Sequence, residues 1–270
     1  MPEGHVIHRL AHVLNERLAG KRVAVTSPQG RFAAEAARLD GQPLTSAEAI
    51  GKHLLIEFDV AEPRFIHIHL GLIGKLRIHP LAPPVGEVRL RISDGDLAAD
   101  LHGPQWCRML TATQRAEVHA ASGPDPLRPD DDPLTVLARI QRSRRSIAAL
   151  LMDQKIAAGV GNIFRAEVLF RHCLPPMTPG NQIDEETWLA LWQDLKHLMA
   201  VAVERGRIDT VADEHSPEAQ QRPPREDPHG GEVYVYRRAG QPCLRCATPV
   251  STTDLEGRSL YWCDNCQRGG

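Results

Sequence analysis

Four cysteines near the C-terminus constrain the fold of this chain more than any other feature. A Cys-x2-Cys pair at Cys243 and Cys246 is followed, after sixteen residues, by a second such pair at Cys263 and Cys266. Each pair presents two thiolates to one ion, so together they predict a tetrahedral site for one structural Zn2+ in a ribbon over residues 233–270. Two disulfide bonds are the alternative, and the lack of a secretion signal disfavours them.

The composition describes a globular protein with more than one domain. A chain of 270 residues is long enough for two or three domains with cores of their own, and 42% of its residues are hydrophobic. No apolar run approaches the roughly 20 residues of a membrane span, so we expect a cytoplasmic protein with no membrane partner. The two remaining cysteines, Cys107 and Cys173, stand alone and are expected to be buried as small hydrophobes.

The distribution of charge points to an anionic partner, although the net charge does not. The formal net charge is only −2, and acidic residues collect in the stretches 125–132 and 209–227. Residues 139–171 include seven basic residues and only two acidic ones, so a protein with a nearly neutral net charge can still have a basic surface. The seven are Arg139, Arg142, Arg144, Arg145, Lys155, Arg165 and Arg171.

The first half of the chain has the pattern of a helix followed by an antiparallel sandwich. Apolar residues recur at helical spacing over residues 5–19, and Gly20 ends the run. Short alternating runs follow at 54–58, 66–70 and 88–92, separated by Gly and Pro turns, as in a β-sandwich. We therefore predict a sandwich domain over residues 1–122, with Lys52 at a turn directly before the first of these strands.

The second half changes to helices after a stretch rich in proline. Residues 123–133 contain four prolines and four acids in eleven positions, which predicts an interdomain linker. Apolar residues then recur at helical spacing and predict a helical domain over residues 134–232. Within that domain, the polar and proline-rich loop 209–231 is expected to be mobile.

A glycine-rich turn inside the helical half is a candidate phosphate site. Gly159 and Gly161 bracket a tight double turn, and Asn162 is predicted to cap the helix that follows. Exposed amides at such a turn, together with Lys155 and the neighbouring arginines, can hold a phosphate.

The N-terminus carries a candidate nucleophile. Removal of Met1 would leave Pro2 as a terminal secondary amine beside the carboxylate of Glu3. An α-amino group titrates near pH ~7.7–8.0, against about 10.4 for lysine, so part of it is nucleophilic at neutral pH. Attack on an aldehyde-level carbon would give an iminium, and Glu3 could move the protons. Alone, the three residues also fit an ordinary chain start.

Together these motifs resemble the formamidopyrimidine-DNA glycosylase and endonuclease VIII family. The start Pro2-Glu3, the segment Asp153–Ile163, the segment Val235–Cys243 and the ribbon occur in the family's order over essentially the whole chain. The resemblance implies an α+β multidomain fold with an N-terminal β-sandwich and leading helix, a helix-two-turn-helix domain and a C-terminal zinc ribbon. It also implies a bifunctional DNA glycosylase and AP lyase of base excision repair, near the nucleoid, which acts as a monomer on damaged DNA held between the two halves.

The resemblance assigns roles to individual residues. Pro2 resembles the nucleophile that attacks the sugar C1′ of the damaged nucleotide, and Glu3 matches the acid that protonates the sugar ring oxygen. Lys52 stands where the family has a phosphate-contacting lysine, and Asn162 where the double turn holds a backbone phosphate. Arg258 matches the arginine at the tip of the ribbon hairpin, which grips the phosphate beside the lesion. Base excision needs a flipped nucleotide held by its phosphates, so cations must converge on one point.

The chain departs from the family pattern where chemistry and lesion choice are decided. The family commonly begins Pro-Glu-x-Pro-Glu, whereas here Gly4-His5-Val6 follows, so a second active-site glutamate is missing and His5 stands in this stretch. The purine-lesion branch has an Arg-Arg-Phe-Gly loop, which corresponds here to residues 101–106. The endonuclease VIII branch fills the gap left in the DNA helix with a Gln-Leu-Tyr triplet. The corresponding residues here are Gly71-Leu72-Ile73, which keep only the leucine. These features favour the endonuclease VIII side and oxidised pyrimidines in duplex, bubble or single-stranded DNA.

Three alternatives stay open. A non-catalytic zinc-ribbon DNA-binding protein would explain the basic stretch and the cysteines. A metalloenzyme could use His5, His8 and His12, although solvated or DNA-facing histidines are the simpler interpretation. A purine-lesion (formamidopyrimidine or 8-oxoguanine) glycosylase would share the same catalytic residues. The choice between β- and β,δ-elimination is also open.

Overall fold

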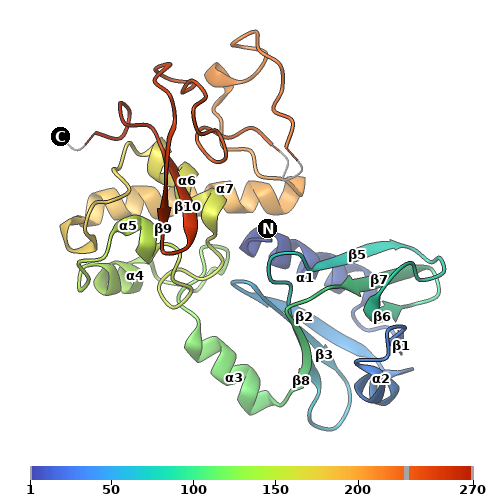
Figure 1. Cartoon of the computed structure of the whole chain (residues 1–270). Coiled ribbons are helices and arrows are strands. Elements are labelled where there is room, and N and C mark those ends of the chain that lie inside the picture. Colours follow the sequence, from blue (N-terminus) through green and yellow to red (C-terminus); the bar gives the residue numbers. More distant parts are fainter. Residues whose placement is uncertain (1, 228–230, 269–270) are drawn as a thin grey trace. The chain divides into compact units, whose positions relative to one another are not determined.

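The computed structural model describes residues 2–227 and 231–268, which belong to two compact units, Met1–Ala121 and Ser122–Gly270 (Figure 1). None of the helices in this described part has the length and apolarity that a membrane span needs.

The first unit is a sandwich of two antiparallel sheets, with helix α1 (Gly4–Leu18) ahead of them. The sheets have the strand orders β1-β6-β7-β5 and β2-β3-β4-β8, and they confirm the predicted β-sandwich with its leading helix. The strands and further helices are β1 (Ala24–Thr26), α2 (Ala33–Leu39), β2 (Leu44–Ile50), β3 (His53–Phe58), β4 (Phe65–His69), β5 (Lys75–Pro80), β6 (Val88–Ser93), β7 (Leu97–His102), β8 (Trp106–Leu110) and α3 (Ala112–Ala121).

Alternation along β3 explains how the sandwich core forms. Leu54, Ile56 and Phe58 are fully buried between the layers, while His53 and Glu57 on the other face are half-buried. Burying an aliphatic or aromatic side chain of this size contributes about 1.5–3 kcal/mol, so a strand with one apolar face is held in register by that face. The outer face of the same sheet carries polar side chains together with the buried Leu55, which packs with Phe65 and Leu110.

Helix α1 packs on this core with a different stripe from the one that its apolar spacing suggests. The apolar side chains with at most 6% exposure are Ile7, Ala11, Leu14 and Leu18, whereas Val6, Leu10 and Val13 are only half-buried. Apolar residues occur around most of this helix, so the periodicity alone does not fix its rotation.

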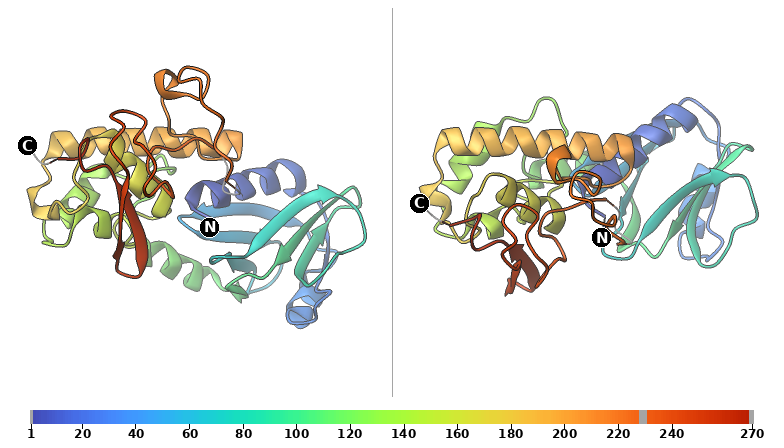
Figure 2. Two further views of the ribbon diagram at one scale, coloured as in Figure 1. Left: turned by 45° about the horizontal axis from the view of Figure 1, so that its top comes forward. Right: turned by 90° about the horizontal axis from the view of Figure 1, so that it is seen from above.

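The second unit combines four α-helices with a two-stranded ribbon among its described residues. The α-helices are α4 (Pro133–Ile140), α5 (Ile147–Leu150), α6 (Asn162–Arg171) and α7 (Glu185–Arg205), and the strands of the ribbon are β9 (Ser251–Leu255) and β10 (Arg258–Trp262). Short 3-10 helices η1 (Gly180–Gln182) and η2 (Asp213–His215) complete it. Strand β10 packs against α6, and Figure 2 shows the tip of the β9–β10 hairpin projecting from the unit.

The proline-rich segment 123–133, predicted as an interdomain linker, is hydrogen-bonded to the second unit. The backbone N–H of Gly123 donates to Gln154 O at 2.8 Å, and that of Ala158 donates to Pro124 O at 2.9 Å. Its last residue is not part of a linker, because Pro133 is the first residue of α4 and Asp132 caps that helix. The mobility predicted for 209–231 stays a prediction: residues 228–230 lie outside the described residues, and Thr210 N bonds Glu232 O at 2.9 Å.

Candidate active site and zinc ribbon

Pro2 and Glu3 stand directly before the first turn of α1. The backbone at Glu3 is extended (φ −109°, ψ 177°), and its carbonyl accepts the N–H of Val6 at 3.0 Å, so α1 begins immediately after it. Pro2 is half-buried, whereas Glu3 is fully buried. A carboxyl group is therefore held out of bulk water one residue from the position where a terminal amine would lie. Such a pair suits proton transfer to a group that the amine attacks.

One of the three α1 histidines, which were expected to be solvated or DNA-facing, is buried. His12 is exposed and His8 is half-buried, but His5 is only 5% exposed. Burial, and then the positive charges of the N-terminus and His8, lower the pKa of His5 to about 4, so it is neutral at pH 7. Among the described residues, the four ribbon cysteines form the only group of His, Cys, Asp and Glu side chains placed to share a metal, so the histidine metalloenzyme gains no support.

Lys52 lies at the tip of a two-residue hairpin, as predicted. Ile50 pairs with His53, and Gly51 between them has φ +55°, a conformation that glycine adopts without strain. Lys52 is half-buried at this tip. The hairpin carries it at one end of the sheet β2-β3-β4-β8.

The turn that was expected to fill the gap in the DNA duplex is strongly exposed. Leu72 and Ile73, in the turn between β4 and β5, have 66% and 79% of their surface exposed. A Cβ atom on Gly71 would lie 3.0 Å from Gln105 Cβ, and Gln105 N donates to His69 O at 2.9 Å. The turn of Leu72 and the loop of Gln105 therefore lie against each other.

The double turn before α6 is built by one glutamine. The side chain of Gln154 donates to Val160 O at 2.9 Å and accepts from Gly159 N at 3.1 Å, while Gly159 has φ +85°. Lys155 is exposed beside this turn. The sequence prediction for Asn162 was wrong in one respect, because Gly161 is the N-cap of α6 and Asn162 is its first helical residue.

Asn162 instead joins the start of α6 to the ribbon. Its Nδ2 donates to Ser259 O at 2.9 Å, and the guanidinium of Arg165 bonds both its Oδ1 and, at 3.2 Å, Ser259 O. Ser259 follows Arg258 at the start of β10, so this contact fixes the double turn beside the hairpin tip. A pocket of about 170 Å³ forms there, lined by Arg145, Ala149, Met152, Asp153, Arg165, Leu255, Glu256 and Arg258.

An ion pair that the sequence did not predict holds this hairpin tip. Arg145 Nη2 lies 2.8 Å from Glu256 Oε2, and its Nη1 lies 3.4 Å from Asp153 Oδ2. Both carboxylates raise the pKa of Arg145, with Glu256 the larger cause. No local pattern links residues 145 and 256, so only the folded chain reveals the pair.

The predicted basic face is smaller than the sequence count suggests. Arg165 is 1% exposed, and Arg171 is half-buried with Asp194 at 2.7 Å. Of the two isolated cysteines that were expected to be buried, Cys107 is half-buried and Cys173 is exposed. Burial raises the pKa of the Cys107 thiol to about 12.

The four ribbon cysteines have the geometry of a tetrahedral zinc site. The Sγ atoms of Cys243 and Cys266 lie 3.8 Å apart, and Cys246 Sγ lies 3.5 Å from the Sγ atoms of both Cys263 and Cys266. Four thiolates about 2.3 Å from a central ion at tetrahedral angles would be about 3.8 Å apart. The donor set and its spacing therefore fit one structural zinc ion, as predicted.

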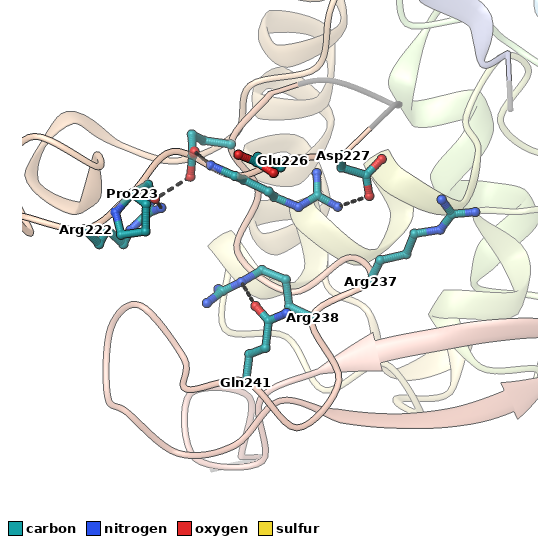
Figure 3. A pocket seen from close by; sticks show the side chains of 9 residues that line it. Arg222, Pro223, Glu226, Asp227, Arg237, Arg238 and Gln241 are labelled. Carbon is teal, nitrogen blue, oxygen red and sulfur yellow. Dashed lines mark hydrogen bonds and ion pairs between the residues drawn. The ribbon is translucent and has the colours of Figure 1, made fainter.

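A second pocket of about 320 Å³ lies in the second unit and is rich in arginine (Figure 3). Its arginines have acceptors of their own: Arg222 pairs with Glu232 at 2.7 Å, and Arg225 with Asp227 at 2.7 Å. Arg238, 8% exposed, donates to Tyr234 O at 2.6 Å. Internal acceptors thus neutralise or engage these three cations.

Comparison with known proteins places these features in one family. Three family models match in succession: the formamidopyrimidine-DNA glycosylase N-terminal domain (residues 1–102), the formamidopyrimidine-DNA glycosylase H2TH domain (122–213) and the zinc finger found in FPG and IleRS (240–269). Endonuclease 8 1 of Mycobacterium tuberculosis is 45% identical over 273 residues, which cover 99% of this chain and 100% of that protein. The chain belongs to the formamidopyrimidine-DNA glycosylase and endonuclease VIII family.

Other members of this family support the assignment. A formamidopyrimidine-DNA glycosylase of Methylococcus capsulatus is 31% identical over 85% of this chain and 84% of its own length. The MutM (Fpg) protein of Thermus thermophilus matches with a TM-score of 0.75 and 26% identity, and the match covers all of both chains. The fold also matches Lactococcus lactis formamido-pyrimidine DNA glycosylase bound to DNA containing an AP site, with a TM-score of 0.77, 21% identity and 99% and 100% coverage. These matches confirm the predicted enzyme class, a DNA glycosylase, and the predicted zinc finger.

Proposed function

We propose that this family member is a bifunctional glycosylase and AP lyase that excises oxidised bases, pyrimidines preferred, and then nicks the strand. The observation that carries the proposal is the buried Glu3 at the head of α1, directly after Pro2. Trimming of Met1 would turn the nitrogen of Pro2 from an amide into a nucleophilic secondary amine.

The proposed chemistry divides between these two residues. The Pro2 nitrogen bonds to C1′, the C1′–base bond breaks with its electron pair leaving on the base, and the base takes up the proton that the amine nitrogen loses. Glu3 donates its proton to the sugar ring oxygen O4′ as the C1′–O4′ bond breaks. The ring-opened sugar is then a cationic iminium on Pro2. Loss of a C2′ proton expels the 3′ phosphate, which is the β-elimination that nicks the strand. Water finally releases the amine from the sugar.

The partner is damaged DNA, which we propose is held by its phosphates. Lys52, Asn162 and Arg258 are the proposed contacts, with Lys155 at the double turn and Leu72 as the wedge. Asn162 and Arg258 belong to neighbouring turns that Ser259 joins, so they can act on one phosphate together. The protein thereby positions a nucleotide that has been taken out of the stack.

Borohydride trapping on abasic-site DNA tests the amine directly. The wild-type protein should form a covalent complex, and Pro2→Gly should trap more slowly while DNA retention is unchanged, because a primary amine still adds. A variant that keeps Met1 should not trap, since its proline nitrogen is an amide. Trapping at the wild-type rate with Met1 retained would disprove the assignment.

A lesion panel then tests the pyrimidine preference. Single-turnover excision of one oxidised pyrimidine and of 8-oxoguanine from the same duplex should favour the pyrimidine. Faster removal of the purine would move the protein to the purine-lesion branch and leave the catalytic proposal intact.

A further inference from the structure

An ion pair at the tip of the β9–β10 hairpin engages an arginine beside the proposed phosphate contacts. Arg145 Nη2 donates to Glu256 Oε1 at 3.1 Å and to Glu256 Oε2 at 2.8 Å. Arg145 belongs to the loop between α4 and α5, whereas Glu256 belongs to the hairpin turn, 111 residues further along the chain. The two side chains keep 45% and 56% of their surface exposed, so the pair lies where a ligand in solution can reach it.

The hairpin turn does not need a glutamate for its own fold. Leu255 pairs with Arg258, so Glu256 and Gly257 form a two-residue turn, and both have positive φ angles, +53° and +75°. Turns of this kind favour asparagine, aspartate or glycine, because other side chains are strained in the left-handed conformation. Gly257 N already donates to Asp254 Oδ1 at 3.0 Å within the turn. What Glu256 contributes is therefore a carboxylate that reaches Arg145.

This carboxylate lines the smaller pocket of the second unit. The charged residues around that space of about 170 Å³ are three arginines and two carboxylates, namely Arg145, Arg165, Arg258, Asp153 and Glu256. The lining therefore carries one positive charge in excess. An arginine binds a phosphate through the same hydrogen bonds that it makes to a carboxylate. Exposed ion pairs are weak, so a phosphate of the DNA backbone can displace Glu256 from Arg145.

We propose that Arg145 binds a phosphate of the DNA backbone and that Glu256 competes with this phosphate for the guanidinium. The inference rests on the proposed function for its ligand. Arg145 contacts the phosphate, whereas Glu256 acts only through Arg145. In the free protein the carboxylate occupies the guanidinium, and each DNA molecule that binds must displace it. The competition lowers the affinity for every duplex, damaged or not, and so shortens the time that the protein spends on undamaged DNA.

Equilibrium binding to an undamaged duplex over a range of salt concentrations tests the competition. Arg145→Met should weaken binding and reduce the slope of log K against log[salt] by about 0.9, because one phosphate fewer is neutralised. Glu256→Gln should tighten binding about 2–5-fold, the change that corresponds to the loss of an exposed ion pair. In the double variant Arg145→Met/Glu256→Gln most of this gain should disappear, because no guanidinium is left to be released. Glu186→Gln, at an exposed position on α7, is the matched control and should bind like the wild type.

A second variant, Glu256→Asn, separates competition for Arg145 from support of the hairpin. Asparagine suits the left-handed turn position, but its side chain is shorter than that of glutamate and carries no charge. If Glu256 competes with phosphate, this variant should also bind DNA more tightly than the wild type. If the ion pair instead holds the hairpin in its DNA-binding shape, both Glu256 variants should bind more weakly, and the proposal is overturned.

Three further results would overturn the proposal. Glu256→Gln with the affinity of the control would show that the carboxylate does not compete. The same gain from Glu256→Gln in the Arg145→Met background would show that Glu256 repels DNA from a distance. Arg145→Met with the wild-type affinity and slope would show that no phosphate reaches Arg145. Binding to an undamaged duplex involves no chemistry at Pro2, so these results are independent of the catalytic proposal, whose failure appears as no borohydride trapping by the wild type.

Discussion

Glu167→Gln offers the sharpest test of how the second unit is held together. Glu167 lies on α6, is fully buried, and accepts four hydrogen bonds with its carboxylate. Oε1 accepts from the backbone N–H of Val235 at 2.9 Å and of Tyr236 at 2.8 Å. Oε2 accepts from Tyr234 N at 2.7 Å and from Thr210 Oγ1 at 2.6 Å. This one carboxylate therefore holds the segment that leads into the zinc ribbon.

The geometry of these four hydrogen bonds gives the size of the stability loss expected for Glu167→Gln. A glutamine amide has one oxygen and one NH2 group, so two of the four donors must face another donor. If the NH2 takes the place of Oε2, the Thr210 hydroxyl can turn and accept, and only Tyr234 N–H is left unsatisfied. An unsatisfied buried N–H costs about 1–3 kcal/mol, and the two remaining bonds become neutral instead of charge-assisted. Relief of carboxylate desolvation offsets part of this, so we expect a net loss of about 2–4 kcal/mol.

Urea unfolding of the zinc-loaded chain, followed by the fluorescence of Trp188 and Trp192, measures this loss. Both tryptophans belong to the core of the second unit. Glu218→Gln changes an exposed glutamate of the same unit in the same way and should stay within about 0.5 kcal/mol of the wild type. A Glu167→Gln midpoint indistinguishable from this control would refute the account of Glu167 as an ionised acceptor of four bonds.

Three further outcomes are expected. Cys266→Ser should release zinc and weaken DNA binding by at least tenfold, because the hairpin tip that carries Arg258 would lose its anchor; a metal-binding dye and gel retardation measure the two effects. Lowering the pH from 6.5 towards 4 should destabilise the first unit by up to about 1.4 kcal/mol per pH unit for each of His53 and His67, because burial lowers their pKa values to about 4 and about 3 and their imidazoles take up protons in the unfolded state but not in the folded state. Denaturation midpoints at pH 7 and pH 5 measure this loss of stability, and the loss should be smaller in His67→Phe. Excision from bubble or single-stranded DNA should equal or exceed excision from matched duplex, because the exposed Leu72 and Ile73 are apolar and Gly71 has no side chain, so none of the three can hydrogen-bond the orphaned base through a side chain. A duplex preference strongly graded by opposite base, in single-turnover assays at fixed salt, would contradict this.

The sequence predicted those parts of the fold that depend on local pattern. Two-residue alternation identified β3, β4 and β6, and the cysteine spacing identified the zinc site. Both patterns reflect geometry within a few residues of the chain, namely the pleat of a strand and the reach of two thiolates to one ion.

The burial of polar residues could not be predicted in the same way. His5 lies on the side of α1 opposite the core stripe and is still only 5% exposed, and Arg165 is 1% exposed although it belongs to a basic run. Asn162 bonds Ser259, nearly a hundred residues further along the chain. A helical pattern shows which side of a helix is apolar, but it does not show which distant segment covers the other side.

Local neutralisation of charge explains why a count of basic residues was a poor guide to the DNA-binding surface. Exposed charges more than about 8 Å apart are largely screened from each other at physiological salt, so the nearest carboxylates decide how much net charge a cation offers to DNA. Arg145 has Glu256 at 2.8 Å and Arg171 has Asp194 at 2.7 Å, and these arginines are already compensated in the protein. Arg165 is 1% exposed and bonds Asn162 and Ser259, so it too presents little charge at the surface although it belongs to the basic run.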